Sequence, residues 1–341
     1  MAKTGIADLP LHYGSAPRWL FDRMVRLSGV ISKFIVEEHG ESEFLRRISN
    51  PFFFQSFCCA IGFDWHSSGT TTTACGALKV ALEKEDIGIR VVGGKGKVAM
   101  KAPEEIKKVS KVYGLDDDHL TQVSRMVAKV DNNCVQDGFS LYHHALFISQ
   151  GGEWAVVQQG MNPDMHVARR YHWLSDIKSF VIEPHTAVCC DIKNPKTLDL
   201  TAFENLQIQK LSLELVNEAK DIKRLAMSHS HEVKITPQLL KSLERLSSIN
   251  PKDYSELVGA PGAGAKTLRA LALLSALIYG TEIKWRDPAL YSFAHGGKDG
   301  YPYPVNRAEY DKSIEILRAA LESLKDSHER AKALRRLSEF V

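Results

Sequence analysis

Apolar residues recur at helical spacing near the start of the chain and again throughout its last third. After Pro17 they fall three or four positions apart, which predicts a helix that ends at Gly40. From Asp199 onward the same spacing predicts an almost wholly helical region. The helices expected in these two stretches cover residues 18–40, 43–48, 201–227, 237–246, 253–258, 265–279 and 288–293, with more from 309 to the end.

The pattern between these stretches is that of short strands mixed with helices. Residues 141–148 and 153–159 are rich in apolar positions and flank Gly151-Gly152, which predicts a β-hairpin. Residues 87–100 also have the character of β structure on either side of a Gly/Lys turn. The remaining elements expected here are helices at 74–83, 103–113 and 118–130, and short strands at 180–182 and 187–190.

These patterns predict an α+β fold. A mixed α+β region containing a β-hairpin is followed by an all-helical C-terminal domain that contains a helix-hairpin-helix. The length of 341 residues is sufficient for two domains with separate cores. We expect them to be 1–195, which joins the N-terminal helices to the α+β region, and 196–341, which is helical.

The segment 260–267, Ala-Pro-Gly-Ala-Gly-Ala-Lys-Thr, joins two predicted helices and suggests a chemical role. Gly262 and Gly264 permit a tight turn that exposes backbone N–H groups at the start of the second helix. A helix N-terminus attracts anions, and Lys266 adds a positive charge there. We expect Gly262, Gly264, Lys266 and Thr267 to bind DNA phosphates, although a purely structural corner between two helices has the same pattern.

Composition restricts the kind of DNA-binding surface and the cellular location that we expect. The net charge is only +3, so any DNA-binding surface must be a local basic patch. The six cysteines show no C-x-x-C spacing, which argues against a zinc ribbon and favours reduced, buried thiols. No signal peptide or membrane-spanning segment is recognisable. We therefore expect a soluble cytoplasmic protein with no membrane partner, and the sequence specifies neither a cofactor nor an oligomeric state.

The hairpin resembles that of the DNA glycosylase superfamily represented by endonuclease III, with Pro261, Gly262, Gly264, Lys266 and Thr267 in register. The resemblance implies that Lys266 is a nucleophile that forms a Schiff base with the sugar, and that an aspartate after the second helix assists it. That aspartate is Asp287, which lies farther along than the family pattern expects. The iron–sulfur cysteines of that superfamily are absent. Without the resemblance, Lys266 is a phosphate contact and Asp287 caps a helix that begins at Pro288.

Over its whole length the chain resembles a prokaryotic family, domain-of-unknown-function family 763. Four stretches carry this resemblance, namely residues 7–12, 62–69, 156–160 and 291–300. The resemblance implies kinship and no established activity.

Two further groups of residues are candidates for function. Arg169 and Arg170 stand in a run of cations and aromatics, Arg-Arg-Tyr-His-Trp, that is suited either to binding DNA or to a packed surface. Carboxylates and imidazoles of the α+β region are potential metal ligands, although their spacing matches no metal motif. They are Asp64, His66, Asp131, Asp137, His143, His144, Glu153, Glu183 and His185.

The leading hypothesis is a DNA-repair glycosylase, with or without lyase activity, in which Lys266 and Asp287 are catalytic. A metal-dependent nuclease that uses the hairpin as a DNA handle is the first alternative. A DNA-binding protein without catalysis is the second. DNA is the expected partner in all three.

Overall fold

A five-stranded antiparallel sheet organises the part of the chain that the computed structural model describes, residues 16–62, 68–190, 193–217 and 236–289. The strand order is β1-β3-β4-β5-β6. The strands are β1 (Ile89–Lys95), β3 (Ser140–Ser149), β4 (Trp154–Asn162), β5 (Val167–Leu174) and β6 (Ala187–Cys189). Two short strands, β2 (Val135–Gln136) and β7 (Leu198–Asp199), pair separately.

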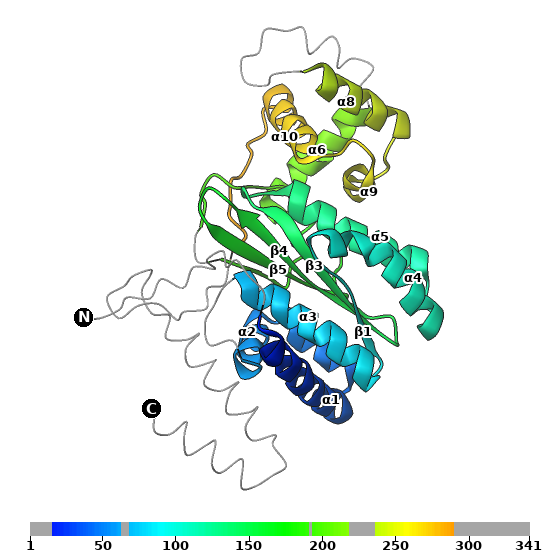
Figure 1. Cartoon of the computed structure of the whole chain (residues 1–341). Helices are drawn as coiled ribbons and strands as arrows, with labels where there is room; N and C mark the ends of the chain where they lie inside the picture. Colours follow the sequence, from blue (N-terminus) through cyan, green and yellow to red (C-terminus); the bar gives the residue numbers. More distant parts are fainter. Residues whose placement is uncertain (1–15, 63–67, 191–192, 218–235, 290–341) are drawn as a thin grey trace, which may run out of the picture. The chain divides into compact units, whose positions relative to one another are not determined.

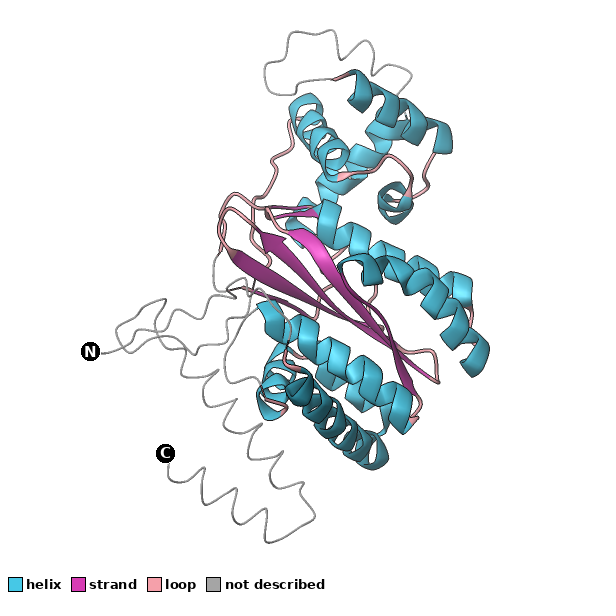
Figure 2. Ribbon diagram, in the orientation of Figure 1, coloured by secondary structure: helices cyan, strands magenta, loops and turns pink. Residues whose placement is uncertain are grey.

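Helices cover both faces of this sheet (Figure 1). The first face packs against α1 (Arg18–Ser49), α2 (Pro51–Ala60) and α3 (Ser68–Glu85), and the second against α4 (Ala102–Tyr113) and α5 (Asp117–Lys129). Figure 2 shows the sheet between these two helical layers. Successive side chains of a strand point to opposite faces, so β4 and β5 contribute buried side chains to both layers.

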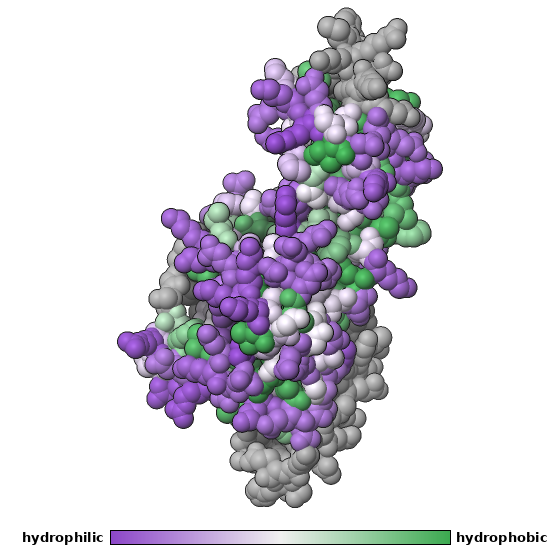
Figure 3. All heavy atoms as spheres, turned by 90° about the vertical axis from the view of Figure 1, so that its right-hand side faces the viewer, coloured by the Kyte–Doolittle hydropathy of each residue, from purple (hydrophilic) through white to green (hydrophobic). Residues whose placement is uncertain are grey.

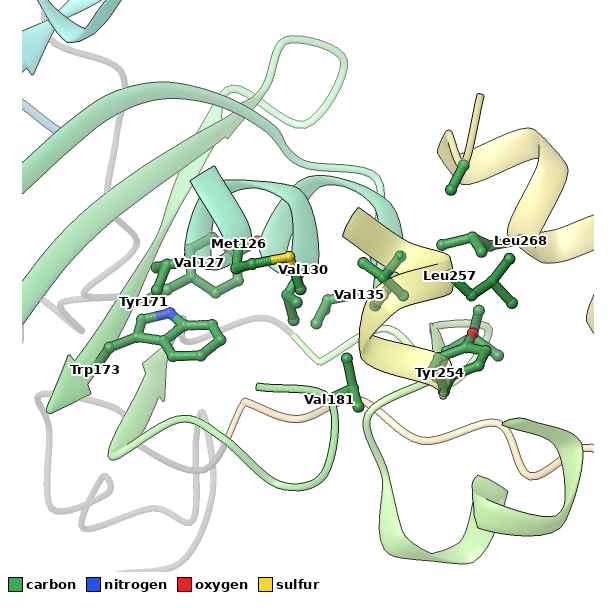
Figure 4. Packing of buried hydrophobic residues seen from close by; sticks show 14 of the residues in the cluster. Met126, Val127, Val130, Val135, Tyr171, Trp173, Val181, Tyr254, Leu257 and Leu268 are labelled. Atoms are coloured by element: carbon green, nitrogen blue, oxygen red, sulfur yellow. The ribbon is translucent and has the colours of Figure 1, made fainter. Parts of the chain in front are cut away.

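A second group of helices follows the sheet in sequence. It contains α6 (Leu206–Asn217), α8 (Pro237–Ile249), α9 (Tyr254–Gly259) and α10 (Ala265–Tyr279). One hydrophobic cluster runs from the sheet into this group, as Figure 4 shows for Trp173 of β5, Met126 of α5, Leu257 of α9 and Leu268 of α10. Residues on both sides of position 195 thus share a core, and the described residues all fall within one compact unit, Asp8–Tyr291. The division into 1–195 and 196–341 stays a prediction.

Several local expectations are confirmed. Gly40 has φ 84° and interrupts α1 where the first helix was expected to end. The helix predicted at 118–130 corresponds to α5, and Asp116 caps it by accepting a hydrogen bond from the His119 amide at 3.0 Å. The hairpin at Gly151-Gly152 forms, and it joins β3 to β4. The predicted helices at 237–246, 253–258 and 265–279 correspond to α8, α9 and α10.

Other expectations are wrong. Residues after β1 form a 3-10 helix, η1 (Gly96–Lys101), where a second strand was expected. Residues 180–182 form bends and turns, and α3 begins at Ser68, before the predicted 74. The sequence also gave no indication that Val167–Leu174 is a strand, β5. The helices predicted from 309 onward lie outside the described residues, as do residues 218–227 of the helix predicted at 201–227 and most of the one predicted at 288–293.

Two short helical segments complete the chain path near the sheet. The π-helical turn η2 (Val130–Cys134) follows α5 directly, and the 3-10 turn η3 (Phe203–Asn205) precedes α6. A π turn carries one more residue per turn than an α-helix and is common at functional sites. Here it places Asp131 against the sheet, where it accepts hydrogen bonds from Trp173 and Gln158.

The surface and the cysteines can be compared with the expectations of no membrane partner and of reduced, buried thiols. Figure 3 shows one face of the molecule on which hydrophilic residues dominate and hydrophobic ones form small separate patches. No helix among the described residues is both long and apolar enough to cross a bilayer. All six cysteines are free thiols, and five are buried as predicted, whereas Cys59 is exposed. Burial raises the pKa of the Cys58 thiol to about 12, which keeps it protonated.

Candidate nucleic-acid interface

The turn between α9 and α10 has the form that the sequence predicts. Asp253 caps α9 by accepting a hydrogen bond from the Glu256 amide at 2.7 Å. The chain then reverses through Pro261 and Gly262, both exposed, and Gly262 has φ 103°. Only glycine adopts this conformation without strain. The first glycine of the Gly-x-Gly pair is therefore required by the backbone.

The N-terminus of α10 opens directly from this turn. Gly264 is its N-cap, and no side chain from the described part of the chain caps the helix. The first hydrogen bond back to the cap runs from the Leu268 amide to the Gly264 carbonyl, at 3.0 Å. The amides of the three residues between them therefore lack intrahelical acceptors. Lys266 is exposed beside these amides, whereas the Thr267 side chain is buried and offers only its amide.

The turn is held in place from its inner side. Lys129 of α5 donates from Nζ to three successive carbonyl oxygens at the end of α9, those of Val258 (3.0 Å), Gly259 (2.7 Å) and Ala260 (2.9 Å). Burial lowers the pKa of Lys129, and nearby Arg125 lowers it further. Gln136 also donates to the Ala265 carbonyl at 2.8 Å. These bonds occupy carbonyl groups and leave the amides of α10 available.

Basic side chains surround the exposed part of the turn. Lys266 and Arg269 lie three residues apart on α10, and both are exposed. Residues at this spacing share one helix face. Arg245 of α8 is also exposed, and its Cδ lies 3.9 Å from where a Cβ on Gly262 would stand. Sequence reasoning missed Arg245, because no local pattern brings α8 to the turn.

The prediction that Arg169 binds DNA is corrected by its burial. Arg169 lies in β5, an inner strand of the sheet, and its side chain has 0% exposure. Its Nη1 donates to Asp137 at 3.0 Å, and its guanidinium forms two bonds to Asp287, at 2.9 and 2.8 Å. Tyr171 also donates to Asp137, at 2.7 Å. Arg169 is the cation at the centre of a buried ion cluster and does not face the surface.

The same correction applies to Arg170. It points to the opposite face of β5 and also has 0% exposure. Its guanidinium carbon lies 4.7 Å from the centre of the Phe54 ring in α2, and Nη1 donates to the Thr71 hydroxyl at 3.2 Å. The strand β5 is paired on both edges and covered by helices on both faces, so neither arginine reaches the solvent.

Asp287 is likewise committed to structural bonds. In addition to its ion pair with Arg169, it accepts hydrogen bonds from the amides of Asn194 (2.6 Å) and Ala289 (2.8 Å). The bond to Ala289 is the capping-type contact expected for an Asp-Pro sequence. No ion pair or hydrogen bond joins Lys266 to Asp287 among the described residues. Lys266 and Asp287 were predicted to act together. In the structure Lys266 is on the surface, and Asp287 is part of the buried ion cluster with Arg169.

Several of the potential metal ligands are engaged with other protein groups. His185 bonds Asp131 at 2.5 Å, and His144 bonds both Ser124 (2.9 Å) and Gln158 (2.8 Å). Burial by itself lowers the pKa of His185, but Asp131 outweighs it and the pKa is raised. Within the described residues no three His, Cys, Asp or Glu side chains are grouped to hold a metal ion. Asp64 and His66 lie outside those residues.

His143 and His144 face opposite sides of β3, as neighbours in a strand must. His144 points to α5, whereas His143 lies on the face that packs against α1 and α3. Among the described residues, neither ring nitrogen of His143 has a hydrogen-bond partner. Burial lowers its pKa to about 3, with smaller contributions from His144 and Lys95. His143 is therefore a neutral imidazole in the interior.

Comparison with known proteins identifies a family. A family model described as "Protein of unknown function (DUF763)" matches residues 5–305. No curated protein matches the chain, and no solved structure matches it. The match covers both the sheet and the helices that form the turn, so the two regions occur together in the family.

Proposed function

The chain belongs to the DUF763 family of proteins of unknown function, and we propose that it binds the sugar–phosphate backbone of DNA through the turn between α9 and α10. The observation that carries the proposal is the exposed N-terminus of α10, where an uncapped first turn lies beside the Gly262–Gly264 turn and Lys266. Helix, glycine turn and helix together make a helix-hairpin-helix.

The proposed attraction between the turn and a DNA phosphate is electrostatic. Backbone amides at a helix N-terminus and the helix dipole both favour a phosphate. Lys266, Arg269 and Arg245 add mobile positive charge around the same turn. Contacts of this kind fix the position of a protein on the duplex without reading its sequence. The proposed binding is therefore independent of base sequence and sensitive to salt.

Catalysis by Lys266 is not part of this proposal. A lysine that forms a Schiff base must lose its proton, which requires burial or close cations. Lys266 is exposed, and the aspartate expected to assist it is bound to Arg169. Borohydride trapping on abasic duplex DNA tests this point, and we expect no covalent adduct.

Salt-dependent anisotropy of a short labelled DNA duplex tests the proposal. Each phosphate contact contributes about 0.9 to the slope of log K against log salt, so Lys266→Ala should lower the slope by about 1. It should weaken binding to all sequences alike. Lys107→Ala, an equal charge change on exposed α4, is the matched control and should leave the slope unchanged. If the duplex does not bind at low salt, or if both variants change the slope equally, the proposal is wrong.

A further inference from the structure

An exposed tryptophan lies beside the basic face of α10. Trp285 is 42% exposed, whereas Trp154 and Trp173 are buried in the core. An indole ring gains much of its favourable free energy by leaving water, so an exposed ring on an ordered segment is available to a ligand. Trp285 stands in the segment that returns from the end of α10 toward the sheet (Figure 1).

The backbone on both sides of Trp285 is anchored. Lys284 exchanges two hydrogen bonds with the Asn205 side chain, of 2.9 and 2.8 Å. Arg286 donates from its amide to the Thr197 carbonyl at 3.1 Å, and Asp287 is held by Arg169. The indole is therefore carried on a segment fixed by neighbouring groups, and binding a ligand costs little further ordering. Asp287 and Arg169 act here as positioning residues.

Arg269 connects this ring to the turn. Its guanidinium carbon lies 5.5 Å from the centre of the Trp285 ring. Arg269 follows Lys266 by three residues on the same exposed helix face, a rise of about 4.5 Å along the axis. The Trp285 ring thus meets, through Arg269, the same exposed helix face that carries Lys266 at the start of α10.

We propose that Trp285 and Arg269 form a stacking site for an unpaired nucleobase of a strand whose phosphate lies at the turn. This inference rests on the proposed function, and it adds the class of substrate. Aromatic rings and guanidinium planes stack well on nucleobases. A base inside a duplex already stacks on both neighbours, so only a single-stranded, gapped or extruded base has a free face for Trp285. The site favours such DNA over an intact duplex.

Paired binding measurements test the inference. Anisotropy titrations compare a short single-stranded oligonucleotide with a fully paired duplex of the same sequence. Trp285→Leu should weaken single-strand binding by about 5- to 100-fold, since stacking contributes this much per base, and duplex binding by less than about 2-fold. Trp285→Phe retains a ring and should recover most of the affinity. Trp19→Leu, at an exposed tryptophan in α1, is the control and should change neither titration.

A second variant and a fluorescence measurement test the stacking site even if Trp285→Leu does not fold. Arg269→Ala removes the cation and leaves the indole, and it should weaken binding of the single strand more than binding of the duplex. Quenching of Trp285 fluorescence by the oligonucleotide, measured as the signal lost in Trp285→Phe, should accompany binding. Equal losses for single strand and duplex, or no quenching on binding, overturn the stacking site while leaving backbone binding intact. If wild-type protein does not bind the duplex at low salt, the proposed function itself has failed.

Discussion

Two clusters of basic residues, Arg169-Arg170 in β5 and Lys266 with Arg269 in α10, have similar local compositions and opposite environments. Each contains two cations, and each is accompanied by aromatic residues. In β5 the side chains are buried, and the charge of Arg169 is matched by Asp137 and Asp287. On α10 both cations are exposed beside uncapped amides.

The role of a cation therefore depends on whether its side chain is buried or exposed. A buried arginine has lost its hydration, so it must be paired, and it then has no capacity left for a ligand. An exposed lysine or arginine keeps its hydration until a phosphate replaces it. The first cluster therefore contributes to the fold, and the second is suited to binding.

The largest expected effect is on stability. Arg169→Met leaves Asp137 and Asp287 without their shared cation in the interior, and we expect the free energy of unfolding to fall by about 3–5 kcal/mol. Arg269→Met removes an exposed cation and should cost at most about 1 kcal/mol. Urea denaturation followed by circular dichroism measures both. Similar losses in the two variants would remove the distinction between the clusters.

The next effect extends the comparison to histidines and pH. His143 has its pKa lowered to about 3 in the folded state, against 6.5 for the unfolded chain. Between these values the unfolded state binds a proton that the folded state does not, so stability falls as pH drops from 6.5 toward 3. The slope for one such group approaches about 1.4 kcal/mol per pH unit.

Denaturation at several pH values measures this slope. His143→Gln should make this slope shallower by that amount. His172 adds to the wild-type slope, since burial also lowers its pKa, with Arg170 acting in the same direction. His185 acts oppositely, because its raised pKa gives stability below 6.5 that is lost as pH rises through the folded value. An identical slope for His143→Gln and wild type would contradict the assignment of His143 as a buried neutral group.

The smallest effect concerns the turn itself. Gly262 has φ 103°, so Gly262→Ala should destabilise the protein by about 1–2 kcal/mol. Gly264 has φ −88° and no atom within 4 Å of an added Cβ, so Gly264→Ala should change stability by less than about 0.5 kcal/mol. Thermal melts of the two variants test whether Gly262→Ala lowers the melting temperature more than Gly264→Ala does. Equal melting temperatures would mean that the turn can relax around either alanine.

Local patterns predicted much of the candidate interface. The turn at Gly262 and the helices on either side of it follow from glycine placement and helical spacing over fewer than thirty residues. The contact between Trp285 and Arg269 could not be predicted, because the two residues are sixteen positions apart and no sequence pattern links them. The same limit applies to Lys129, whose amine meets carbonyl groups about 130 residues later in the chain.

The α+β order, the β3–β4 hairpin and the glycine turn could be predicted from the amino-acid sequence, because each depends on residues close together along the chain. Three features became visible only in the folded chain: β5 is a buried strand, Arg169 and Asp287 form one ion cluster, and Lys266 remains on the surface. These depend on which distant segments cover a side chain. A run such as Arg-Arg-Tyr-His-Trp has the same composition on a surface or in an interior, and burial and pairing with remote carboxylates alone distinguish the two.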